Sequence, residues 1–189
     1  MKGKIEKFTG EGTVFRSGIV NSVAMTEILP PQESLGSLKT YLERVSAAIE
    51  QHSGRIVRFD GDTVVAFWQG AGDDPSHAQA AFDAACAILK SLAPPSGNDA
   101  DVMMEVRIVL GTGSMGGDFF GPTKQFQIVG AAVLIADHLF KMKDTDGSVI
   151  RMSQYTADKI NAPEPLQEEG LIKRDGSEDL RVYGYRPAN

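Results

Sequence analysis

The fold follows from one stretch of sequence, Arg58-Phe59-Asp60-Gly61-Asp62-Thr63-Val64-Val65-Ala66-Phe67. Residues typical of β-strands lie on both sides of Asp60-Gly61, a pair that is common in tight turns between antiparallel strands. The sequence therefore predicts a β-hairpin, with strands over residues 55–59 and 63–68.

A helix is predicted on each side of this hairpin. The first is amphipathic and ends at Gly54, because apolar side chains recur at three- and four-residue steps at Leu35, Leu38, Leu42, Val45 and Ile49. The second helix covers residues 75–92 and is followed by a surface loop over residues 93–101.

The remaining elements complete a known arrangement. The predicted order β-α-β-β-α-β is the split βαβ arrangement of ferredoxin-like folds, so the fold class is α+β with later extensions. The other predicted elements are strands at 13–20, 106–110, 126–129, 171–173 and 180–185, a helix at 131–141 and a short helix from Ser153 to Ile160, with a glycine-rich passage after residue 110.

Length and composition bound the function. The chain has 189 residues, which fits a single domain over residues 1–189. Its net charge of -6 argues against a nucleic-acid partner or an anionic membrane surface. No stretch reaches the length of a membrane span, so we expect no membrane insertion and a cytoplasmic location. The single cysteine, Cys86, cannot form an internal disulfide, and its apolar neighbours predict a buried thiol.

Several segments share their order and spacing with one known family, and together they cover most of the chain. They are Phe15-Arg16-Ser17-Gly18-Ile19-Val20, His52-Ser53-Gly54, the hairpin itself, Ser76-His77-Ala78, Arg107-Ile108-Val109-Leu110-Gly111-Thr112-Gly113, and the run from Gln127 through Leu134 to His138. The last matching segment is Arg174-Asp175-Gly176-Ser177-Glu178 with Val182-Tyr183. In this series the chain resembles the class III adenylate and guanylate cyclase catalytic domain.

The resemblance implies the nucleotide cyclase fold, in which helices pack on a central, mostly antiparallel sheet, and it implies a specific reaction. In that family a nucleoside triphosphate is converted to cyclic AMP or cyclic GMP with release of pyrophosphate, and two Mg²⁺ or Mn²⁺ ions held by two carboxylates assist the step. Asp62 matches the second of these carboxylates. Gly18 occupies the position of the first and offers no side-chain oxygen. Asp60 is an alternative metal ligand, but an aspartate before glycine in a turn also has a structural explanation.

Two further family positions are altered on the predicted helix at 131–141. The family places an asparagine and an arginine there, facing the cleft from the partner subunit, and Leu134 and His138 stand in their places. A leucine donates no hydrogen bond, and loss of one such donor commonly costs about a hundredfold in rate. The apolar stripe of this helix is predicted to be Ala132, Ile135, Ala136, Leu139 and Phe140, and Leu134 lies off it. It is either a lone surface leucine or, as we prefer, a residue that packs across the cleft of a homodimer.

The base-reading and phosphate-binding positions are also changed. The lysine and aspartate that read adenine in the family correspond to Arg58 and Gln127, and a phosphate-contacting lysine corresponds to Arg174. All three side chains retain hydrogen-bonding ability. Each is equally explained as a solvated strand or turn residue.

Two hypotheses follow from these comparisons. The first is a catalytically degenerate homodimer with a signalling or regulatory role, with a nucleoside triphosphate as a compatible ligand. The second is an active but unorthodox cyclase that uses Asp60 and Asp62 for metal or pairs with a complete partner. A dinucleotide-binding site is disfavoured, although residues 111–116 fit the pattern G-x-G-x-x-G, because no helix is predicted to begin on these glycines.

Overall fold

The predicted hairpin is present in the computed structural model, which describes residues 6–20, 22–71, 74–92, 105–143, 149–174 and 178–187. Strand β2 (Arg55–Asp60) pairs with β3 (Thr63–Gln69) in antiparallel register. The turn is Gly61-Asp62, and Gly61 has a φ of 59°, in the left-handed region that glycine adopts without strain. Asp62 therefore lies at the tip of the hairpin, whereas Asp60 is the last residue of β2.

The hairpin belongs to a larger mixed sheet. Among the described residues, eight strands form one sheet in the order β2-β3-β1-β4-β6-β8-β7, and β5 pairs with β4 beside this path. Only the described β4–β6 pairing is parallel. The predicted α+β class with a mostly antiparallel sheet is confirmed. The other strands are β1 (Phe8–Ile19), β4 (Val106–Phe120), β5 (Gln125–Gly130), β6 (Val149–Ser153), β7 (Gln167–Ile172) and β8 (Leu180–Tyr185).

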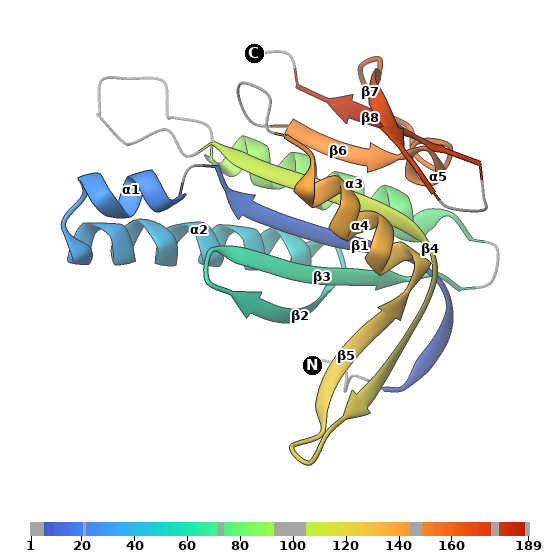
Figure 1. Ribbon diagram of the computed structural model, residues 1–189, viewed down its shortest axis with the longest axis horizontal. Coiled ribbons are helices and arrows are strands. Elements are labelled where there is room, and N and C mark those ends of the chain that lie inside the picture. Colours follow the sequence, from blue (N-terminus) through green and yellow to red (C-terminus); the bar gives the residue numbers. More distant parts are fainter. Residues whose placement is uncertain are drawn as a thin grey trace.

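Helices cover both faces of the sheet (Figure 1). On one face, α2 (Pro31–Gln51) and α3 (Ser76–Leu92) enclose a core that includes Phe15. On the other face, α4 (Ala131–Lys141) packs against a second core that includes Val14. Neighbouring residues of β1 thus face opposite helices, as the alternation of a strand requires. The two short helices are α1 (Ser22–Ile28) and α5 (Gln154–Ala157).

Glycine sets the distance between α4 and the sheet. A Cβ atom on Gly111 of β4 would lie 2.7 Å from the carbonyl oxygen of Ala132 and 2.7 Å from the amide nitrogen of Ala136. Real Cβ atoms do not approach backbone this closely, so only glycine lets α4 settle onto β4. The helix is consequently held directly on the sheet by its small, buried residues Ala132 and Ala136.

Strand β4 extends farther than the sequence predicted. The predicted strand ended at residue 110, but β4 continues through the glycine-rich passage to Phe120, paired with β1 on one side and β5 on the other. The far half of β4 and β5 form an arm that projects from the body at the bottom of Figure 1. Residues 111–116 lie inside β4, so no helix begins on these glycines, and the dinucleotide site is excluded as expected.

Smaller differences also have local causes. Gly54 does not provide the left-handed residue after α2; Ser53 does, with a φ of 64°. Gly54 is instead needed because a Cβ there would run into the Trp68 ring. The short helix after Ser153 ends at residue 157 rather than 160, and Cys86 is half-buried rather than buried. The predicted loop at 93–101 lies outside the described residues.

A chain of buried polar side chains links α3 to the middle of the sheet. Its hydrogen bonds join His77 Nδ1 to Thr13 Oγ1 (2.9 Å), Thr13 Oγ1 to Thr112 Oγ1 (2.8 Å), and Thr112 Oγ1 to Thr156 Oγ1 (2.8 Å). Burial lowers the pKa of His77, and the Glu11 carboxylate, 3.4 Å from Nε2, opposes this shift. Because buried polar groups are costly when unpaired, this chain ties α3, β1, β4 and α5 together.

No helix in the described parts of the chain is both long enough and apolar enough to cross a membrane.

Candidate functional site

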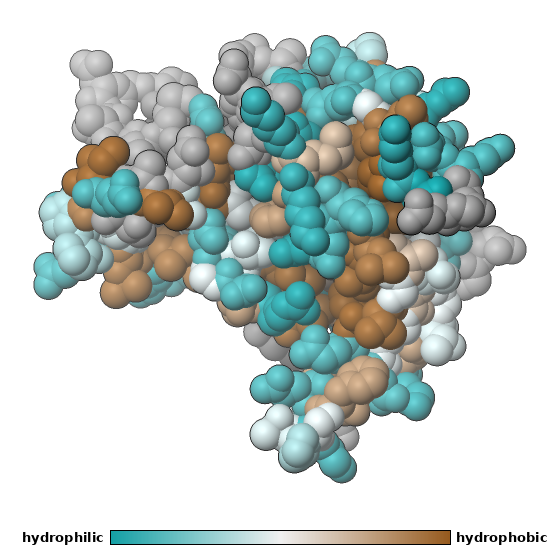
Figure 2. Space-filling view, in the orientation of Figure 1, coloured by the Kyte–Doolittle hydropathy of each residue, from teal (hydrophilic) through white to brown (hydrophobic). Residues whose placement is uncertain are grey.

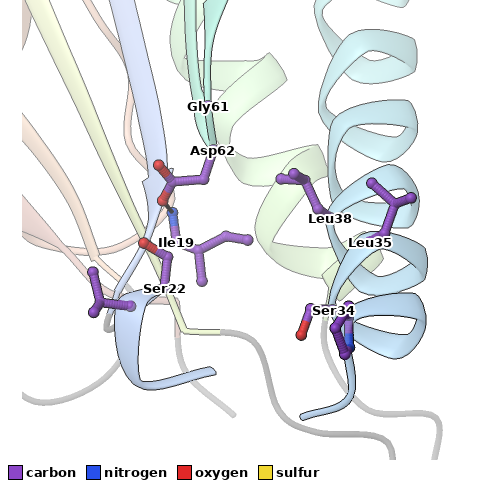
Figure 3. Close-up of a pocket in the computed structure, with 9 residues that line it drawn as sticks. Ile19, Ser22, Ser34, Leu35, Leu38, Gly61 and Asp62 are labelled. Atoms are coloured by element: carbon purple, nitrogen blue, oxygen red, sulfur yellow. Dashed lines mark hydrogen bonds between the residues drawn. The ribbon is translucent and has the colours of Figure 1, made fainter. Parts of the chain in front are cut away.

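A pocket of about 500 Å³ lies beside the tip of the β2–β3 hairpin (Figure 3). Asp62 and Ile19 form one side of it, and Ser34, Leu35 and Leu38 of α2 form the other. The Asp62 carboxylate is half-buried, and its Oδ2 accepts a hydrogen bond from the backbone N–H of Ile19 (3.1 Å). The pocket therefore combines a largely apolar wall with a single carboxylate.

Tyr41 lies in the core behind this pocket. Its hydroxyl is joined to Ser17 Oγ by a hydrogen bond of 2.8 Å. Burial raises the pKa of Tyr41 strongly, and the charge of Asp62 adds to the rise. The tyrosine is consequently a neutral hydrogen-bonding group beneath the hairpin tip and does not supply a negative charge to the site.

The mouth of the pocket is continuous with an apolar surface. Figure 2 shows apolar side chains gathered at the end of the molecule formed by α1 and the start of α2. Val23, Ile28 and Leu35 are 70%, 79% and 67% exposed there. An exposed apolar cluster of this kind is typical of a contact surface.

Gly18 lies on β1 one residue before Ile19 and faces α4. A Cβ atom at Gly18 would lie 3.0 Å from Phe140 Cζ and 3.4 Å from Thr63 Oγ1. Asp62 instead extends to the amide of Ile19 and lines the pocket, whose Ile19 wall belongs to the opposite core. The Asp62 carboxylate thus lies against the peptide that follows Gly18, while Phe140 and Thr63 lie next to the position of a Gly18 side chain.

The predicted face of α4 is open to solvent. Its buried residues are Ala132, Ile135, Ala136 and Leu139, as the apolar stripe predicted. Leu134 is 63% exposed and His138 is exposed. Both side chains thus stand on the outer face of the helix, one turn apart, which is the placement that the sequence predicted.

Arg58 and Gln127 come from neighbouring elements. Arg58 is exposed on β2, and Gln127 is half-buried on β5, opposite Asp118 of β4. Strands β2 and β5 are in contact. The two predicted base-reading residues are therefore on adjoining strands of the same region.

Arg174 is engaged by its own loop. Its Nε donates to the carbonyl oxygen of Glu178 (2.9 Å), and its guanidinium carbon lies 5.9 Å from the centre of the Tyr155 ring. These contacts hold the side chain near the β7–β8 connection. A phosphate ligand at Arg174 would have to compete with the Glu178 carbonyl.

Sequence comparison now assigns this architecture. Residues 6–184 match the family model of the adenylate and guanylate cyclase catalytic domain. The chain belongs to this family. Adenylate cyclase 1 of Rhizobium meliloti (strain 1021) is 30% identical over 179 residues, which cover 92% of the chain and 27% of that relative. The chain thus spans about a quarter of the curated relative it matches.

Solved structures of nucleotide cyclases share the fold. The adenylyl cyclase CyaB from P. aeruginosa superposes with a TM-score of 0.78 at 22% identity, covering 98% of both chains. The guanylate cyclase domain of RhGC from Catenaria anguillulae, solved in complex with GTP, gives 0.76 at 20% identity, covering 95% of this chain and 97% of that one. At these identities the likeness establishes the fold.

Class III cyclases use divalent metal, but the residues present here do not fit a two-ion site. No group of three or more His, Cys, Asp or Glu side chains in the described segments is arranged to hold a metal ion. Asp62 offers one carboxylate, Gly18 offers none, and Asp60 is exposed on β2. Hard cations such as Mg²⁺ require several oxygen ligands, so one carboxylate makes an incomplete site.

Three important residues were missed in the sequence. Phe140 was assigned only to the apolar stripe of α4, and Arg16 and Arg107 only to strands. In the structure both guanidinium groups lie over the Phe140 ring, at 4.5 Å and 4.9 Å from its centre. The available signal was a glycine in a strand, which indicates that something packs closely there.

Proposed function

We propose that the chain is a single cyclase-homology domain that forms a homodimer, is catalytically degenerate, and acts in signalling or regulation. The observation that carries this proposal is the exposed face of α4, where Leu134 and His138 take the places of the asparagine and arginine of the family. A developing charge on phosphate oxygens needs fixed donors. Leucine supplies none, and a histidine ring cannot present the forked set of five N–H donors that an arginine offers.

The exposed apolar residues support dimerisation. Phe59 of β2, Val129 of β5 and Leu134 of α4 are 52%, 56% and 63% exposed. Contacts join β5 to both β2 and α4, so these residues come from adjoining elements. A related domain, the guanylyl cyclase domain of RhoGC from Blastocladiella emersonii, is described as a non-canonical dimer. Association would cover the apolar side chains and form the cleft between two copies.

A nucleoside triphosphate is the ligand that this cleft would take. Arg58 and Gln127 offer donors and an acceptor for a base edge, from adjoining strands. Binding without turnover is consistent with base-reading side chains that are changed but can still hydrogen-bond, beside altered catalytic positions. Arg174 would join the phosphates only after leaving its own loop.

The activity test separates this proposal from an unorthodox cyclase. Purified protein is incubated with ATP or GTP and Mg²⁺ or Mn²⁺, and cyclic product is measured by liquid chromatography with mass detection. We expect no product above the level given by Asp62→Ala. Product that Asp62→Ala abolishes would overturn the degenerate assignment and favour a cyclase that uses Asp62.

The dimer test uses a matched pair of leucines. Leu134→Lys places a charge on the proposed interface, and Leu171→Lys changes a leucine on β7 that is 52% exposed. In sedimentation velocity we expect the wild type and Leu171→Lys to be dimers and Leu134→Lys to shift toward monomer. A wild-type chain that stays monomeric at high concentration would contradict the interface.

A further inference from the structure

The ring of Phe140 is held between two arginines on the sheet below it. The guanidinium carbons of Arg16 and Arg107 lie 4.5 Å and 4.9 Å from the ring centre, which is cation–π distance. Arg107 Nη1 also donates to the carbonyl oxygen of Phe140 (2.6 Å), and Arg16 Nη1 pairs with Asp137. Four contacts thus fix the last turn of α4 on β1 and β4.

This ring fills the space above Gly18. A Cβ at residue 18 would lie 3.0 Å from Phe140 Cζ, tighter than ordinary van der Waals contact, and 3.7 Å from Cε2. An aspartate would add a carboxyl group beyond that Cβ, where the ring already lies. A side chain at position 18 would therefore require the Phe140 ring to move by a few tenths of an ångström, and glycine avoids this shift.

Electrostatic repulsion disfavours a metal ion beside Gly18, as the volume of the Phe140 ring also does. Two guanidinium groups flank the ring, and Asp137 already pairs with Arg16. A divalent cation placed beside them would be repelled by both, because like charges at such distances interact unfavourably even with partial screening. Asp62, the remaining carboxylate, lies at the hairpin tip and binds the amide of Ile19.

We infer that Phe140, clamped by Arg16 and Arg107, has replaced the first divalent cation of the family site, so that the chain binds at most one such ion, at Asp62. The inference rests on the proposed function, because that proposal equates Gly18 with the position of the first metal ligand. Beyond the proposed function, the inference states that a side chain, Phe140, fills the site of the first metal ion. Loss of the carboxylate alone would leave it open to water and ions.

The test counts metal ions and does not use activity. Equilibrium dialysis with Mn²⁺, alone and with a non-hydrolysable ATP analogue, gives the number of ions bound per chain. We expect no more than one for the wild type, no gain for Gly18→Asp, and one additional ion for Gly18→Asp combined with Phe140→Ala. Asp62→Ala is expected to remove the ion that the wild type binds.

Several outcomes would overturn the inference. A second ion on the wild type, or a gain from Gly18→Asp alone, shows that Phe140 does not close the position. No gain in a folded double variant shows that the ring is not what excludes the ion. Gly18→Asp with Phe140→Leu, which leaves a smaller gap, replaces the first double variant if that one melts early. Detection of cyclic product would overturn the proposed function without changing these counts.

Discussion

The two faces of strand β1 are packed against their helices by different kinds of interaction. Toward α3, Thr13 joins a buried chain of hydroxyl groups and His77 in which the members are hydrogen-bonded. Toward α4, the Nε atom of Arg16 is buried without a hydrogen-bond partner among the described atoms, and the guanidinium lies over the Phe140 ring. Hydrogen-bonded polar side chains stabilise the α3 face. The Phe140 ring and the charged groups that flank it stabilise the α4 face. The α3 side is therefore expected to contribute more to stability than the α4 side.

The largest expected effect breaks the polar chain at its centre. Thr112→Val removes the hydrogen bonds to Thr13 and Thr156, and we expect a loss of about 2 to 3 kcal/mol in the free energy of unfolding, because each net bond contributes about 1 kcal/mol and the freed groups stay buried. Urea denaturation measures it. Thr9→Val, at an exposed position of β1, is the control and should change stability by less than about 0.5 kcal/mol. If Thr9→Val lowered the free energy of unfolding as much as Thr112→Val, the buried hydrogen bonds would not be what stabilises the α3 side.

A substitution on the α4 side is expected to lower the free energy of unfolding by less. Phe140→Ala removes a half-buried ring and both cation–π contacts, and we expect about 1 to 2 kcal/mol, below the 3 to 5 kcal/mol typical of a fully buried phenylalanine. Urea denaturation is again the measurement. Phe120→Ala, at the exposed end of the β4 arm, serves as the control. A loss as large as that of Thr112→Val would mean that this cluster also holds the fold together.

The ion pair between Arg16 and Asp137 should contribute still less to the free energy of unfolding. Asp137→Asn removes the charge that pairs with Arg16, and we expect about 0.5 kcal/mol, since both side chains keep contact with water. The effect should shrink as salt is raised, because salt screens partly exposed charges. Unfolding at low and high sodium chloride checks this. No salt dependence would indicate that the pair acts through packing alone.

The smallest effect is a pH dependence from the α3 side. Burial lowers the pKa of His77 below its ordinary value, despite the Glu11 carboxylate and Asp74, while Lys159 adds to the lowering. The unfolded chain therefore binds the proton more readily, so stability is full above the unfolded pKa and falls as the pH drops through the window between the two values. His77→Gln should flatten the slope of unfolding free energy between pH 7.5 and 5.5. His138→Gln, at an exposed histidine, is the matched control.

Sequence alone predicted elements whose causes are local. The hairpin around Gly61, the apolar stripe of α4 and the exposure of Leu134 follow from turn chemistry and helical periodicity, and the structure has all three. The continuation of β4 past residue 110 was missed because glycines usually end strands. Here β1 pairs with all four glycines from Gly111 to Gly117, and β5 pairs with Gly116 and Gly117 from the other side.

The candidate site was predicted less completely, for a physical reason. The positions of Asp62, Leu134 and His138 could be assigned by matching segments along the chain. The contact of Phe140 with Gly18 joins residues far apart in sequence, and neither residue is unusual in its own segment. Only the distance between α4 and β1 reveals it, and that distance depends on Gly111, where a side chain would lift the helix.

The fit between Gly18 and Phe140 also has an evolutionary consequence. An aspartate at position 18 would bring its Cβ to 3.0 Å from Phe140 Cζ, and a smaller residue at position 140 would leave a gap over glycine and remove two cation–π contacts. Either change alone is unfavourable, although the two together are compatible, which is how coupled neighbours behave. If Gly18 holds the position of the family's first metal ligand, as proposed, gain of a second carboxylate there would therefore require both substitutions, and the packing opposes a single-step change.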